Sequence, residues 1–120
     1  MQTTIVVLAA VFFLGMGSYA LAAPAALVRP FHLTAQTPEA RSEIRAVYGG
    51  FGLAIAAVLV LALVRDDLRT GVVVTVAAAL AGMALGRLVS RLADRPTAFY
   101  PVWFYFGVEA VTAGLLVATV

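Results

Sequence analysis

Four long apolar stretches dominate the hydrophobic pattern of the chain. They cover residues 4–22, 46–64, 71–92 and 99–119, and short polar segments separate them. A helix of about 20 residues crosses the roughly 30 Å hydrocarbon core of a bilayer. Because the connections are short, no room is left for a soluble domain. The pattern predicts an all-α fold, an integral membrane four-helix bundle of up-down-up-down topology.

Prolines and polar residues set the expected ends of these helices. Pro24 and Pro30 interrupt the first helix, and Thr37-Pro38-Glu39 combines an N-cap, a first-position proline and an acidic residue near the positive helix end. Residues 65–70 form a polar turn, and Pro96 follows the third helix. We expect helices at about 3–23, 38–64, 70–93 and 98–119 in a single transmembrane domain, 1–120.

The first stretch also has a feature of signal peptides. Residues 19–24 read Tyr-Ala-Leu-Ala-Ala-Pro, which is similar to a signal-peptidase site after an apolar core. No lysine or arginine precedes that core, however. We therefore expect the stretch to remain as a membrane helix, with the interfacial segment 27–36 after it.

Composition agrees with a membrane protein and excludes several functions. The chain is 63% hydrophobic and 12% charged, with a mean hydropathy of +1.04. All eight basic residues are arginines, and a scattered net charge of +2 is not typical of nucleic-acid binding. Without cysteine the chain forms no disulfide and no thiolate site, and His32 alone makes no histidine metal cluster. We predict no metal and no cofactor.

Three polar residues lie inside apolar stretches at similar expected depths. Glu109 is the clearest, because a carboxylate near the bilayer centre costs roughly 2.5–3.5 kcal/mol on insertion scales. Tyr48, Arg87 and Glu109 lie roughly 7 to 18 Å from the side of the loops 23–42 and 93–98, which we call the loop side. We expect them to converge on one polar chamber, with Arg87 and Glu109 as an ion pair.

Further residues complete the expected site. Arg45, Arg91 and Asp94 project toward its rim, and Tyr105 shares a helix face with Glu109. Tyr48 and Tyr105 can donate phenolic hydrogen bonds. The candidate set comprises the catalytic candidates Glu109, Tyr48 and Arg87, and the ligand-binding candidates Glu43, Arg45, Tyr105, Arg91, Asp94 and Trp103.

The chain resembles a known family in three places. These are the block Glu43-Ile44-Arg45-Ala46-Val47-Tyr48-Gly49-Gly50, the segment Gly86-Arg87-Leu88-Val89-Ser90 followed by Asp94 and Pro96, and the glutamate in the last helix. Together they are similar to small bacterial four-helix membrane proteins that form a domain of unknown function related to the DoxX-like membrane proteins. The resemblance implies a multi-pass protein of the bacterial inner membrane and supports the grouping of the polar residues. It implies no activity.

Three kinds of function fit these residues. The first is a protein that binds a small lipophilic molecule, with acid–base chemistry by Glu109 in an isomerase, a cyclase or an epoxide-opening enzyme. The second is a proton-coupled small transporter, although an arginine beside the carboxylate would hold it ionised and oppose proton cycling. The third is a structural or accessory subunit whose ion pair fixes helix packing.

Small residues form two further faces. Gly82-x-x-x-Gly86 allows close helix approach, and we expect it to pack within the chain rather than between chains. Gly49, Gly50 and Gly52 are expected to pack in the same way. Gly107 and Gly114 lie on the last helix. These faces are compatible with a homodimer within the lipid bilayer.

Overall fold

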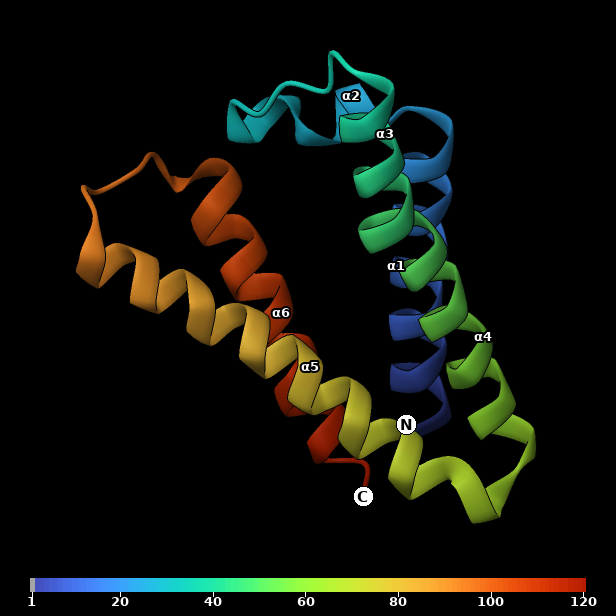
Figure 1. Ribbon diagram of the computed structural model, residues 1–120. Coiled ribbons are helices and arrows are strands. Elements are labelled where there is room, and N and C mark those ends of the chain that lie inside the picture. The colour runs from blue at the N-terminus through green and yellow to red at the C-terminus, as the bar shows by residue number, and fades with distance from the viewer. Residues whose placement is uncertain (1) are drawn as a thin grey trace.

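The computed structural model describes residues 2–120, and it confirms the all-α membrane fold. Four helical segments are long and apolar enough to cross a bilayer: Gln2–Ala22, Pro38–Val64, Asp66–Ala93 and Phe99–Val117. The start of the first, the end of the last and the turn at Arg65 lie on one side of the molecule, and the other two connections lie on the loop side (Figure 1). The topology is therefore up-down-up-down, as predicted, and the protein is a multi-pass membrane protein.

The second spanning helix consists of three parts. It runs through α3 (Pro38–Ile44), the π-helical stretch η2 (Arg45–Gly50) and α4 (Phe51–Val64). Ile44 and Phe51 keep right-handed helical dihedrals, so the chain does not break at either junction. Thr37 is the predicted N-cap, because its side-chain oxygen accepts a hydrogen bond of 3.0 Å from the amide of Ala40.

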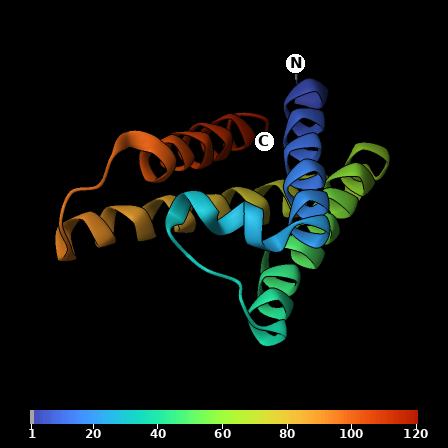
Figure 2. The ribbon, with the colours of Figure 1, turned by 90° about the horizontal axis from the view of Figure 1, so that it is seen from above.

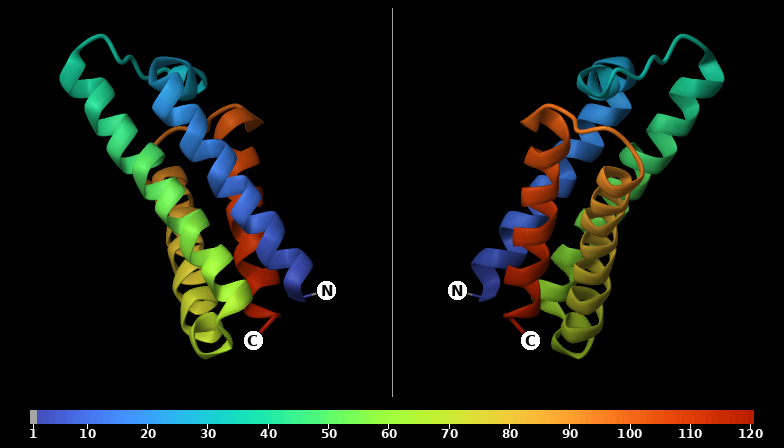
Figure 3. Two further views of the ribbon diagram at one scale, coloured as in Figure 1. Left: turned by 90° about the vertical axis from the view of Figure 1, so that its right-hand side faces the viewer. Right: turned by 90° about the vertical axis from the view of Figure 1, so that its left-hand side faces the viewer.

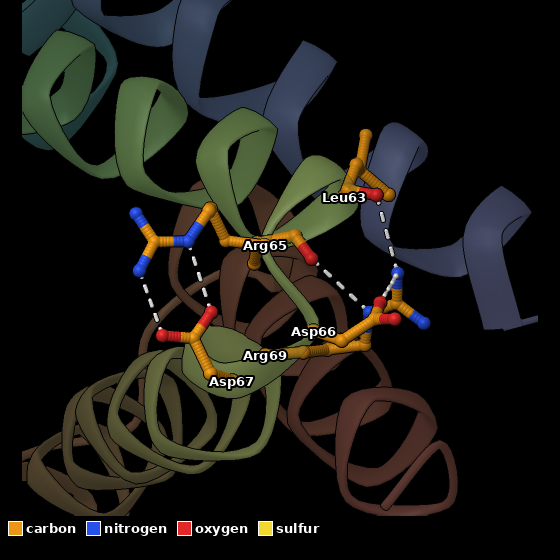
Figure 4. A network of polar contacts seen from close by, with 6 residues as sticks. Leu63, Arg65, Asp66, Asp67 and Arg69 are labelled. Carbon is orange, nitrogen blue, oxygen red and sulfur yellow. Dashed lines mark hydrogen bonds and ion pairs between the residues drawn. The ribbon is translucent and has the colours of Figure 1, made fainter.

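The connection between the second and third helices is shorter than predicted. α5 (Asp66–Ala93) begins directly after Arg65, so most of the expected turn 65–70 is helical. The side chain of Arg65 donates to Asp67, while Arg69 pairs with Asp66 and donates to the last carbonyls of α4 (Figure 4). The acids lie at the positive start of α5 and an arginine satisfies the end of α4, which makes a one-residue connection possible.

Two shorter elements occupy the loop side. After α1 (Gln2–Ala22), the chain forms α2 (Pro24–Val28) and the 3₁₀ turn η1 (Arg29–Phe31), where the sequence predicts an interfacial segment. η1 contacts the π-helical stretch η3 (Phe99–Trp103), which continues into α6 (Phe104–Val117). Figures 1 and 2 show this connection running from the end of α1 across the loop side toward α6.

The helices associate as two antiparallel pairs. α1 packs along η2 and α4, and α5 packs along α6. The two pairs meet on the side of the termini and diverge toward the loop side (Figure 1). The side views show both termini and the connection between α4 and α5 at one end of the molecule and the other two connections at the opposite end (Figure 3). The buried core joins all four spans through Val6, Phe13, Leu59, Leu80 and Leu116.

Glycines allow close contact between the helices of the first pair but not between those of the second. A Cβ atom on Gly17 of α1 would lie 2.9 Å from the Gly49 carbonyl oxygen and 2.9 Å from the Leu53 nitrogen, so only glycine fits at that crossing. Gly52 lies on α4, the helix that faces Gly17, and packs directly against it. The expectation for Gly82 and Gly86 is wrong, because nothing lies within 4 Å of a Cβ built on either residue. Their face of α5 is open.

Candidate functional site

Arg87 of α5 and Glu109 of α6 form a buried ion pair with two hydrogen bonds. Nε of Arg87 donates to one carboxylate oxygen at 2.8 Å, and Nη2 donates to the other at 2.9 Å. The side chain of Glu109 is 3% exposed and that of Arg87 is 21% exposed. This planar two-bond geometry matches the guanidinium fork to both oxygens at once and neutralises a charge that would be costly in lipid.

Two neighbouring aromatic rings contact the guanidinium of Arg87. The ring centroids of Phe31 and Tyr105 lie 5.7 and 5.8 Å from its central carbon, within the range of a cation–π interaction. The two rings also contact each other, with 5.7 Å between centroids. The predicted Tyr105 therefore belongs to the site. Phe31 was not predicted, because its short segment between Pro30 and His32 indicates a surface position.

Tyr48 and Arg45 do not join the pair. Tyr48 of η2 is 44% exposed, and within residues 2–120 its side chain makes no hydrogen bond and no aromatic contact. Arg45 donates instead to the carbonyl oxygen of Leu21 at 3.1 Å. That carbonyl lies at the end of α1, just before Pro24 interrupts the helix, and the cation caps it.

The remaining candidates lie away from the ion pair. Glu43, Arg91 and Asp94 are exposed, and the carboxylate of Asp94 accepts a hydrogen bond from the amide of Arg95. Trp103 packs edge-to-face on Phe106 of the same helix, with 5.4 Å between ring centroids. Of the three residues expected to converge, Arg87 and Glu109 meet and Tyr105 joins them in place of Tyr48, and among residues 2–120 no hydrogen bond, ion pair or aromatic contact links the other candidates to these three.

Two concavities of the molecule lie outside the ion pair. One is a shallow depression along α3 that includes Glu39, Ser42 and Glu43. The other is a groove of about 150 Å³ between α1 and α6, and its lining is almost entirely apolar. The groove residues are Ile5, Leu8, Ala9, Phe12, Val108, Thr112 and Leu115.

The ion pair offers donors rather than acceptors to another molecule. The carboxylate of Glu109 accepts two hydrogen bonds from Arg87 and its side chain is 3% exposed, which leaves its other lone pairs out of reach, whereas Nη1 of Arg87 has no acceptor among residues 2–120. A guanidinium carries five N–H groups, so several remain available. In the described part of the chain, no group of three His, Asp or Glu side chains is placed to hold a metal ion.

Comparison with known proteins identifies the family. Neither the curated proteins nor the solved structures include a match to this chain. One family does match, and it covers residues 1–120, the whole chain. The protein therefore belongs to the family described as a domain of unknown function, DUF4345.

Proposed function

We propose that this protein is a membrane receptor for a small lipophilic molecule whose polar head binds at Arg87. The observation that supports it is the neutral, bidentate pair between Arg87 and Glu109, which joins two spanning helices while the Arg87 side chain stays 21% exposed and its Nη1 has no acceptor among residues 2–120. A pair that serves helix packing alone has no need of a donor without a partner.

The chemistry of the pair defines the head group. Because Glu109 already neutralises Arg87, a second anion would leave the site with a net negative charge in a medium of low dielectric constant. An uncharged acceptor, such as a carbonyl or an ether oxygen, takes a hydrogen bond from Nη1 without that penalty. The rings of Phe31 and Tyr105 lie next to each other and together provide an apolar surface beside the guanidinium.

Binding agrees better with this geometry than acid–base catalysis or proton transport does. The side chain of Glu109 is 3% exposed and both its oxygens accept from Arg87, so a substrate reaches the carboxylate only if the pair moves. The receptor function requires no such rearrangement. Catalysis by Glu109 is therefore not included in the proposal.

The test compares the molecules that co-purify with three forms of the protein. Arg87→Met/Glu109→Gln removes both charges and keeps similar side-chain volumes, and Arg91→Met is the matched control one turn further along α5. Each form is extracted into lipid nanodiscs, and the bound lipophiles are quantified by mass spectrometry. Circular dichroism confirms that the double variant remains folded.

We expect a stoichiometric uncharged lipophile in the natural protein and in Arg91→Met, and its loss in the double variant. The proposal is overturned if the natural protein carries none, or if the double variant retains it. In either case the pair between Arg87 and Glu109 is a packing element of a structural subunit.

We also propose a location and a wider relationship for the family. The block from Glu43 to Gly50 and the glutamate in the last helix support a relationship to the DoxX-like membrane proteins and a place in the bacterial inner membrane. Fractionation of the native host's membranes tests the location, and recovery of the protein from any other membrane contradicts it.

A further inference from the structure

One face of α6 links the ion pair to the groove between α1 and α6. Tyr105, Val108, Thr112 and Leu115 follow one another at helical spacing, so they share that face. Tyr105 contacts the guanidinium of Arg87, and the other three residues line the groove. The face therefore leads from the accessible donors of Arg87 into an apolar depression.

The groove is suited to a hydrocarbon chain. Its volume is about 150 Å³, and Thr112 is its one polar residue. The stripe from Tyr105 to Leu115 is about 15 Å long at 1.5 Å per residue. Both helices that form it are spanning segments, so the groove opens where acyl chains surround the protein.

We propose that this groove holds the alkyl tail of the same molecule whose head binds at Arg87. The inference rests on the receptor function proposed above, and it defines the ligand class as an amphiphile with an uncharged acceptor head and an alkyl tail. The tail lies along Val108, Thr112 and Leu115 of α6, against Leu8 and Phe12 of α1.

The main competitor for the groove is bulk membrane lipid. Lipid tails are as apolar as leucine side chains, so the groove gains little by taking an alkyl chain out of a bilayer. Tail binding must therefore depend on the head at Arg87, which anchors the chain at the start of the stripe. This dependence separates a specific tail site from nonspecific lipid contact.

Photo-crosslinking in nanodiscs tests the proposal with two long-chain methyl ketones. One carries a diazirine beside the carbonyl group and the other carries it at the far end of the chain. Crosslinked peptides are mapped in the natural protein, in Arg87→Met/Glu109→Gln and in two valine variants. Val108→Phe fills the groove, and Val111→Phe is its control, because Val111 is 61% exposed and does not line the groove.

We expect the probe with the diazirine beside the carbonyl group to crosslink near Phe31 and Tyr105, which we call the head label. The probe with the diazirine at the far end of the chain should crosslink to the groove residues of α1 and α6, which we call the tail label. The double variant loses both labels, Val108→Phe loses the tail label from the groove, and Val111→Phe loses neither. The tail site is overturned if the tail label is unchanged in the double variant or never reaches the groove. In that case a head label that depends on the ion pair still supports the receptor function. If the head label is also independent of the pair, the receptor function fails as well.

Discussion

The ring of Phe31 lies over the guanidinium of Arg87, with 5.7 Å between the ring centroid and Cζ. Phe31 belongs to η1, in the connection between the first two spanning helices, whereas Arg87 lies in α5. The contact therefore ties the loop-side connection to the buried ion pair between the other two helices. We expect both the stability of the bundle and access to Arg87 to depend on it.

Phe31→Leu should destabilise the protein more than an exposed phenylalanine does. A cation–π contact contributes roughly 0.5–2 kcal/mol, and leucine keeps the apolar volume but loses the ring. Phe99→Leu is the matched control, since Phe99 is 68% exposed on the same side of the molecule. Thermal unfolding in a mild detergent measures both variants. Equal melting temperatures for the two variants would show that the ring contributes nothing.

Removal of one member of the ion pair should lower the free energy of unfolding more than removal of both. Arg87→Met leaves the carboxylate of Glu109 buried and unpaired, and breaking a buried pair in this way costs roughly 3–5 kcal/mol. Arg87→Met/Glu109→Gln removes the charge together with its partner and should recover most of that loss. Unfolding free energies of the natural protein, both single variants and the double variant give the coupling. Additive single effects would contradict a direct interaction.

The sequence was sufficient to predict the four spans and the ion pair for physical reasons. A hydrophobic run of bilayer length is a strong signal, and charged residues within such a run must find each other. Projection of side chains at 100° per residue was less successful for Arg45 and Tyr48. Both lie in the π-helical stretch η2, where the wider turn rotates the following residues away from the ideal helical stripe.

The structure also corrects the interpretation of the glycines. A small-residue motif indicates that close approach is possible, but it does not identify the partner helix. Gly17 and Gly52 have a partner within the chain, while Gly82 and Gly86 face open space. A homodimer through the open face of α5 stays a prediction.

Substitution of the glycines should separate packing positions from open ones. Gly17→Ala places a methyl group against the backbone of Gly49 and Leu53, and overpacking of this kind typically costs about 1–3 kcal/mol. Gly82→Ala meets no neighbour and should stabilise the helix by roughly 0.5–1 kcal/mol. Thermal unfolding of the two variants side by side provides the measurement. A loss of stability in Gly82→Ala that depends on protein concentration would reveal a second copy on that face.

The loop side should face the cytoplasm, because arginines are concentrated there. Arg29, Arg41, Arg91 and Arg95 lie on that side, whereas Arg65 and Arg69 lie on the other and are paired with aspartates. Short connections rich in arginine are retained on the cytoplasmic side of bacterial inner membranes.

Single cysteines can report the orientation directly, because the natural chain contains none. Thr34→Cys lies in the loop-side connection and Thr70→Cys lies near the start of α5, and both positions are exposed. A membrane-impermeant maleimide added to intact cells should label Thr70→Cys, provided that the outer membrane is made permeable. Thr34→Cys should react only after the inner membrane is opened, and the cysteine-free parent controls for background. Labelling of Thr34→Cys in intact cells, with Thr70→Cys protected, would establish the opposite orientation.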